Sequence, residues 1–313
     1  SLTLPEMIEM SRYLPPQIGE FNLFAIRMEE PEGLDVFWRN MMTCTHLTSL
    51  NISHFKELPP AFFLEWMKTS PISTITLEIH TDDDPIASHF AQVLCEMKQL
   101  RELELDGRWK LMEPQLKKCT QLTKLHIPST MVPPTMATMV ENMSELVELR
   151  VNKQMSPPFY DLHFPQLTSL DILVQDSDLH LLADFLQRHP KLTHLAVFFC
   201  GIIDTKQGWN ILFSCPELVS VIRRDSDGLD SEPVLPPLPP TLRRLTWYIL
   251  DGTEVGPPEN HLLTHFQDEP NANNVRRHQT LVGYHLDLIR TFWPANAYSS
   301  YVQSVEDSEY EEW

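Results

Sequence analysis

The stretch Leu122-Thr-Lys-Leu-His-Ile127 decides the fold, because its pattern returns along most of the chain. Apolar residues stand at its first, fourth and sixth positions. The last two alternate as in a short strand with one buried face. The same frame starts at Leu47, Ile72, Leu100, Leu146, Leu167, Leu192 and Leu242, with a degenerate copy at Leu218 and a first copy at Ile18.

From Leu47 to Leu242 the copies start 21 to 28 residues apart. This spacing is typical of leucine-rich repeats, whose period is roughly 20–29 residues. A strand this short cannot bury its apolar side alone, but stacked copies form a parallel sheet over a continuous core. We therefore predict parallel strands near residues 48–52, 73–79, 101–105, 123–127, 147–151, 168–173, 193–198 and 243–249.

The segments between these strands are amphipathic and predict helices over residues 34–42, 61–67, 85–94 and 178–186. They begin next to Asp, Ser or Pro, which favour the first turn of a helix. Helices between parallel strands predict an α/β solenoid, a leucine-rich-repeat horseshoe of the ribonuclease-inhibitor type. The strands would line its concave face and the helices its convex face.

The repeat frame also predicts the domain organisation. Residues 1–17 would form an N-terminal cap or the remnant of a preceding module, and residues 18–250 the solenoid. Apolar residues in segment 251–293 favour a helical C-terminal cap, with helices over residues 260–266 and 275–293. Residues 294–313 contain five acidic residues and no Lys or Arg, and we interpret them as an acidic tail.

Composition limits the classes of function. The chain carries 43 acidic and 24 basic residues, a net charge of −19. Such a field repels nucleic acid and anionic membrane and attracts partners with a basic or mixed surface. No stretch is apolar for long enough to span a membrane. We find no catalytic, metal-binding or phosphate-binding motif, so we expect a monomeric protein that is no enzyme and needs no cofactor.

The cysteines favour a reducing compartment, the cytosol or the nucleus. Five of them are spread along the chain, which is a poor disulfide framework. Cys44, Cys119 and Cys215 stand at the same phase of the repeat, three residues before the first leucine of a copy. We interpret these three as buried fillers of the turn before each strand.

Several copies carry a family resemblance. Cys119-Thr-Gln-Leu-Thr-Lys-Leu-His-Ile127, His189-Pro-Lys-Leu-Thr-His-Leu-Ala-Val197 and Cys215-Pro-Glu-Leu218 resemble the repeats of F-box leucine-rich-repeat proteins. The proline-rich Leu235-to-Leu245 segment is similar to repeats of the fungal set. The resemblance covers residues 18–250 and implies substrate recognition in a ubiquitin ligase. The F-box itself is not seen ahead of the strand predicted at Ile18.

Candidate partner-binding residues lie beside the fourth and sixth positions of each frame, where side chains would face the concave surface. Those at the late copies are aromatic, apolar or cationic, the types enriched in binding hot spots: Phe198, Ile222, Arg224, Arg244 and Tyr248. A second set places three carboxylates on one strand: Glu102, Glu104 and Asp106. Two alternatives to the ligase role stay open, namely an acidic chaperone or carrier for a basic client and a regulator that binds an enzyme.

Overall fold

The computed structural model describes residues 4–23, 33–55, 59–79, 84–107, 112–127, 133–200, 205–225, 241–250, 276–281 and 284–291. The chain divides into two compact units, Ser1–Thr168 and Ser169–Trp313. Strands and helices alternate along unit 1 and along the first part of unit 2. None of the helices in these ranges has the length and apolar character needed to cross a membrane.

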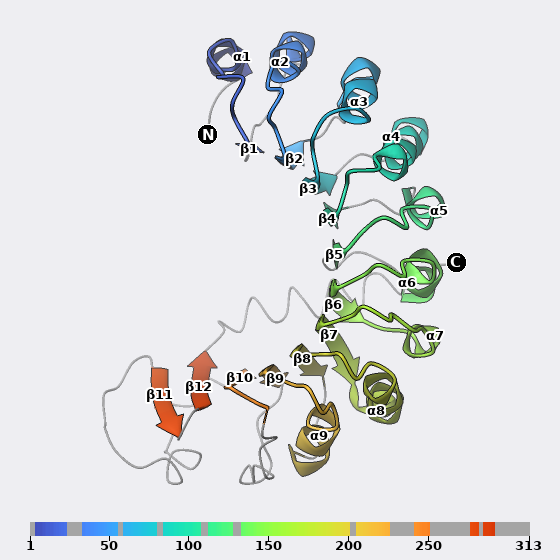
Figure 1. Cartoon of the computed structure of the whole chain (residues 1–313), viewed down its shortest axis with the longest axis vertical. Helices are drawn as coiled ribbons and strands as arrows, with labels where there is room; N and C mark the ends of the chain where they lie inside the picture. Colours follow the sequence, from blue (N-terminus) through green and yellow to red (C-terminus); the bar gives the residue numbers. More distant parts are fainter. Residues whose placement is uncertain are drawn as a thin grey trace. The chain divides into compact units, whose positions relative to one another are not determined.

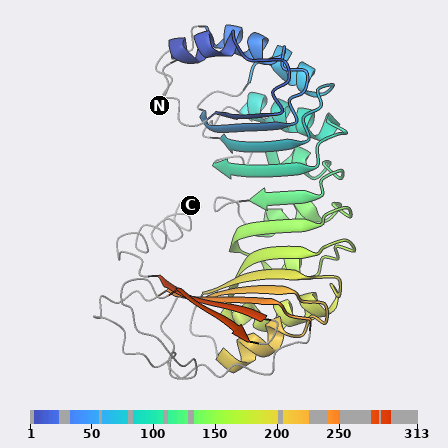
Figure 2. The ribbon, with the colours of Figure 1, turned by 60° about the vertical axis from the view of Figure 1, so that its left-hand side comes forward.

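Unit 1 contains a parallel sheet whose strands follow chain order (Figures 1 and 2). Its strands are β1 (Glu20–Leu23), β2 (Ser49–Phe55), β3 (Thr74–Ile79), β4 (Glu102–Gly107), β5 (Lys124–Ile127) and β6 (Glu148–Gln154). Its helices are α1 (Leu4–Ser11), α2 (Leu34–Met41), α3 (Ala61–Met67), α4 (Asp84–Glu96), α5 (Glu113–Leu116), α6 (Pro133–Val140) and α7 (Pro157–Tyr160).

The helices of unit 1 lie along one side of its strands (Figure 1). We call the opposite side of the sheet the outward face.

Unit 2 continues the alternation with β7 (Ser169–Gln175), a short 3-10 helix (Asp176–Asp178), α8 (Leu179–Gln187), β8 (His194–Cys200), α9 (Thr205–Leu212), β9 (Ser220–Asp225) and β10 (Arg244–Leu250). Strands β7 to β10 pair in parallel in chain order. Strand β12 (Tyr284–Thr291) is parallel to β10, and β11 (Arg276–Leu281) is antiparallel to β12. The α/β leucine-rich-repeat fold and all the predicted strands are thus confirmed.

The leucine frame forms the core. The residues that open the nine copies from Leu47 to Leu242 are all at most 1% exposed. The fourth positions also align from strand to strand, with Leu50, Ile75, Leu103, Leu125 and Leu149 in register. Burial of these apolar side chains is the main favourable term in folding, so the same frame that the sequence displays holds the repeats together.

Backbone hydrogen bonds fix the register where each strand begins. The carbonyl of Thr48 accepts the N–H groups of Ser73 and Thr74 at 2.8 and 3.1 Å. The carbonyl of Arg101 does the same for Thr123 and Lys124 at 2.8 and 3.0 Å. Each repeat is therefore locked to the next at the same point of its frame.

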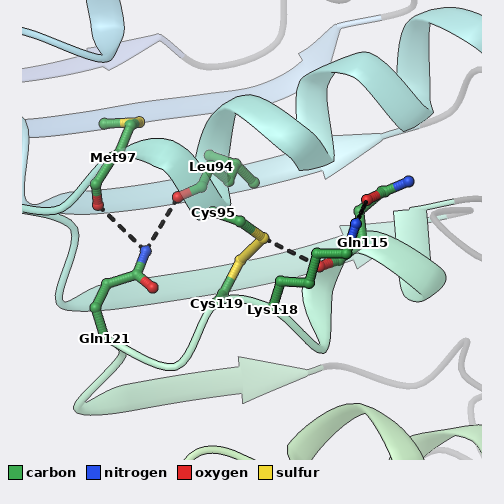
Figure 3. Close-up of a disulfide and its surroundings, with 7 residues drawn as sticks. All are labelled: Leu94, Cys95, Met97, Gln115, Lys118, Cys119 and Gln121. Atoms are coloured by element: carbon green, nitrogen blue, oxygen red, sulfur yellow. Dashed lines mark hydrogen bonds between the residues drawn. A yellow bond between two sulfur atoms is a disulfide. The ribbon is translucent and has the colours of Figure 1, made fainter.

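Cys119 is buried in the turn before β5, as predicted, but the expectation of a poor disulfide framework is wrong here, because Cys119 forms a disulfide with Cys95 (Figure 3). The two residues are 24 positions apart, which is one repeat. The end of α4 therefore lies beside the turn that precedes β5. Gln121 fastens the same turn, because its side-chain amide donates to the carbonyls of Leu94 and Met97 at 3.1 and 3.2 Å. Cys44 and Cys215 are buried free thiols, as predicted.

The helix predicted over residues 275–293 is also wrong, since this segment contains β11 and β12. Leu286 and Leu288 alternate with His285 and Asp287, a two-residue period that favours a strand. The helix predicted over residues 260–266 and the acidic tail lie outside the described residues.

Candidate functional site

The outward face of unit 1 carries charged side chains in two rows that cross the strands. Register places Glu102 of β4 beside Lys124 of β5, and Lys124 beside Glu148 of β6. The second row contains Glu104, His126 and Arg150 on the same three strands. We call these six residues the charge ladder. Because alternate residues of a strand point to opposite sides, the leucines between them face the core.

Ion pairs join neighbouring members of the ladder. Lys124 Nζ lies 2.7 Å from Glu102 Oε1. His126 Nδ1 lies 3.0 Å from Glu104 Oε1, and this contact is an ion pair when the imidazole is protonated. On β6, Arg150 Nη2 lies 2.6 Å from Glu148 Oε1. The predicted acidic residues Glu102 and Glu104 are therefore both matched by nitrogen groups from β5.

The position of Lys124 affects its protonation. The hydrogen bond to Glu102 raises the pKa of Lys124, and the negative charge of Glu148 raises it further, while desolvation and the charge of Arg150 act in the opposite direction. Lys124 therefore stays cationic at neutral pH. Its side chain is 47% exposed, so a partner can reach it.

The ladder surrounds an open hollow of about 230 Å³. The hydroxyl of Thr76 donates to Glu104 Oε2 at 3.4 Å and extends the polar surface onto β3. The hollow is lined by Thr74, Ile75, Thr76, Glu102, Leu103, Glu104, Lys124, Leu125, His126, Glu148 and Arg150. The surface is polar and open, and it offers carboxylate, ammonium and guanidinium groups for a partner to contact.

The late set of candidate residues lies in unit 2. Phe198 on β8 and Ile222 on β9 are half-buried. Arg224 and Tyr248 are neighbours in the register of β9 and β10, and Arg244 pairs with Ser220. The side chains of these last three, and that of Asp106 on β4, lie outside what the structure describes. Leu173 pairs with Phe198 and is only 6% exposed, so apolar side chains do gather here.

The structure also explains the degenerate copy at Leu218. Arg223, at its sixth position, is fully buried in the core of unit 2. Its guanidinium carbon lies 5.0 Å from the ring centre of Phe199 and 4.8 Å from that of Trp209. The break in the apolar pattern therefore marks a core substitution and does not by itself mark a binding site.

Sequence reasoning placed Lys124, His126, Glu148 and Arg150 on the predicted concave face but did not select them. The missing information was the strand register, which pairs acids of β4 with bases of β5. Metal binding finds no support in the described ranges, where no three His, Cys, Asp or Glu side chains are grouped to hold an ion.

No protein-family model matches the chain, and no curated protein matches it in sequence. Among solved structures, the chain is similar to an internalin (inlF) from Listeria monocytogenes str. 4b F2365. The identity is 15%, the alignment covers 80% of each chain, and the TM-score is 0.39. The α/β leucine-rich-repeat fold therefore rests on the repeat geometry described above, namely the strand register and the buried leucine frame.

Proposed function

We propose that the chain is a non-catalytic scaffold that recognises a partner protein through the outward face of its sheet. The observation that carries this proposal is the charge ladder. On one side of the repeat strands the leucines pack into the core, while the other side presents exposed charges around an open hollow. Clustered charges of this kind steer association and fix the register of a partner.

The ladder favours a partner with a mixed surface over a purely basic one. It contains three carboxylates, two permanent cations and one histidine. Its own charges nearly cancel, although the whole chain has a net charge of −19. A uniformly basic client would meet Lys124 and Arg150 as like charges, which cost binding energy when they lie opposite each other.

At a finer level, we propose that the partner is a substrate of a ubiquitin ligase and that the chain is the substrate-binding part of an F-box-type subunit. The support is the resemblance of copies such as Cys119–Ile127 to F-box leucine-rich repeats. The second candidate, an acidic chaperone or carrier, is favoured by the overall charge. Ubiquitination of the captured partner that depends on this protein would support the first and contradict the second.

The test is affinity purification with a matched pair of charge-reversal variants. The ladder variant combines Lys124→Glu with Arg150→Glu. The control combines Lys117→Glu with Lys118→Glu, two exposed lysines in the turn after α5, and makes the same change in net charge. We expect the ladder variant to lose the partner by at least about tenfold, since reversed charges repel what the native ones attract. Equal retention by both variants would contradict a site on the ladder.

A further inference from the structure

The order of charges in the ladder limits the kind of segment that fits it. Along β4 both members, Glu102 and Glu104, are acids. Across the strands the first row changes sign at each step, from Glu102 to Lys124 to Glu148, whereas the second row runs from Glu104 to His126 to Arg150. A segment that runs along any one of these strands meets only two ladder residues, whereas a segment laid over the first row meets three charges of alternating sign. Charge complementarity therefore favours a partner that lies across the strands.

The spacing of the strands selects the conformation of that segment. Neighbouring strands are about 4.8 Å apart, so the row from β4 to β6 spans about 9.6 Å. On a helix, residues i and i+7 lie about 10.5 Å apart along the axis, with i+3 or i+4 between them on the same face. In an extended chain, residues i and i+4 on one face are about 13 Å apart. The helix matches the row, and the extended chain does not.

The ion pairs within the ladder do not prevent such docking. In the docked row the side chains of Glu102, Lys124 and Glu148 are 38%, 47% and 21% exposed. Ion pairs at exposed sites contribute little to stability and exchange partners readily. Each charged group can therefore keep its neighbour and also accept a contact from above.

From these observations we propose that the ladder docks an α-helical segment of the partner, laid across β4, β5 and β6. Its docked face carries a basic residue over Glu102, an acidic residue one turn later over Lys124, and a basic residue at i+7 over Glu148. This inference rests on the proposed function and names the partner's structure and charge order.

Synthetic peptides provide the probe. The matched peptide is an alanine-based helix with Lys, Glu and Lys at i, i+4 and i+7. Its isomer has the same composition, with lysines on one face and glutamate on the opposite face. A third peptide carries a central proline, which breaks the helix. By fluorescence anisotropy at low salt, we expect the matched peptide to bind at least about tenfold more tightly than the other two, the factor that an added ordered charge contact can supply. Equal affinities, or no binding, would overturn the inference.

A charge-swapped protein tests the order itself. Glu102→Lys combined with Lys124→Glu keeps the internal ion pair and the net charge, so the fold should persist, as a thermal melt would verify. The swap should remove the preference for the matched peptide. If the swapped protein still binds the matched peptide more tightly than the isomer, the helix does not contact the row formed by Glu102, Lys124 and Glu148. If the peptides fail but the Lys124→Glu, Arg150→Glu variant still loses its natural partner, the helix inference falls and the proposed function stands.

Discussion

Arg223 shows how a single residue can break the repeat pattern without breaking the fold. Its buried guanidinium lies against Phe199 and Trp209, an arrangement in which a cation is attracted to ring faces. Gly208 on α9 provides the room. A Cβ at Gly208 would lie 2.9 Å from Nη1 of Arg223. The glycine of α9 and the arginine of β9 are therefore a matched pair in the core of unit 2.

Gly208→Ala should destabilise the protein by up to roughly 2 kcal/mol. Alanine favours a helix over glycine by up to about 1 kcal/mol, but overpacking a filled core costs about 1–3 kcal/mol. Chemical denaturation measures the difference, with Asn210→Ala at an exposed position of α9 as control. A Gly208→Ala protein more stable than the parent would mean that Arg223 is not held in this place.

Leu125→Ala should cost about 2–5 kcal/mol of unfolding free energy, because it empties a slot between stacked repeats. Leu125 is 1% exposed and lies in register with Leu103 and Leu149. Val219, which is 36% exposed, gives the control change Val219→Ala, with an expected loss well under that of Leu125→Ala. Similar unfolding midpoints for both variants in a denaturant titration would contradict the assignment of Leu125 to a buried position of the repeat.

The buried thiol of Cys215 predicts a dependence of stability on alkaline pH. Burial raises the pKa of Cys215 from 9.0 to about 12. Above pH 9 the unfolded chain loses a proton that the folded chain retains, so the stability contributed by the thiol is complete below pH 9 and is lost as the pH rises towards 12. Between pH 8 and 10 the loss should be roughly 1 kcal/mol. Denaturation of Cys215→Ala should show a shallower decline over this range, and identical slopes would speak against a buried thiol.

At the scale of elements, the disulfide joins the end of α4, which leads into β4, to the turn before β5, and so ties together the segments that lead into two strands of the ladder. Closing a loop of 24 residues restricts the unfolded chain and stabilises the fold by roughly 3 kcal/mol in the chain-entropy description. A reductant should therefore lower the melting temperature of the native protein. The Cys95→Ser, Cys119→Ser variant should melt lower and should not respond to reductant. A melt of the native protein that reductant leaves unchanged would contradict the bond.

The elements differ in how far the sequence could predict them. The strands around Leu50, Leu125 and Leu195 were predictable because alternation and a constant repeat period are both local signals. The disulfide was not, because Cys95 and Cys119 are distant in sequence and become neighbours only when one repeat stacks on the next. The pairing of Glu102 with Lys124 likewise depends on register between strands. Strands β11 and β12 were missed because their leucines were assigned to a helical period.

At the scale of the whole molecule, the candidate binding residues of the two units differ in kind, being charged in unit 1 and partly apolar in unit 2. In unit 1 the outward positions carry the ladder. In unit 2 the corresponding strands carry the half-buried Phe198 and Ile222, and Leu173 beside Phe198 is buried. The two sets are thus suited to different contributions: charges mainly set the rate and orientation of association, while buried apolar and aromatic contacts slow dissociation.

The last prediction is that Arg224 and Tyr248 of unit 2 contribute a large share of the binding energy. Arg224 of β9 and Tyr248 of β10 are register neighbours, and Arg224 is also paired with Phe198 of β8. Arg224→Glu combined with Tyr248→Ala should cost at least about 2 kcal/mol of binding, through loss of an aromatic anchor and reversal of a charge. Calorimetry with the captured partner would measure it, with Ser49→Ala on unit 1 as a control of small expected effect. In contrast, Glu102→Gln with Glu104→Gln should mainly lower the association rate and its dependence on salt. If the unit 2 variant binds as tightly as the parent while the ladder variants do not, the partner is held by unit 1 alone.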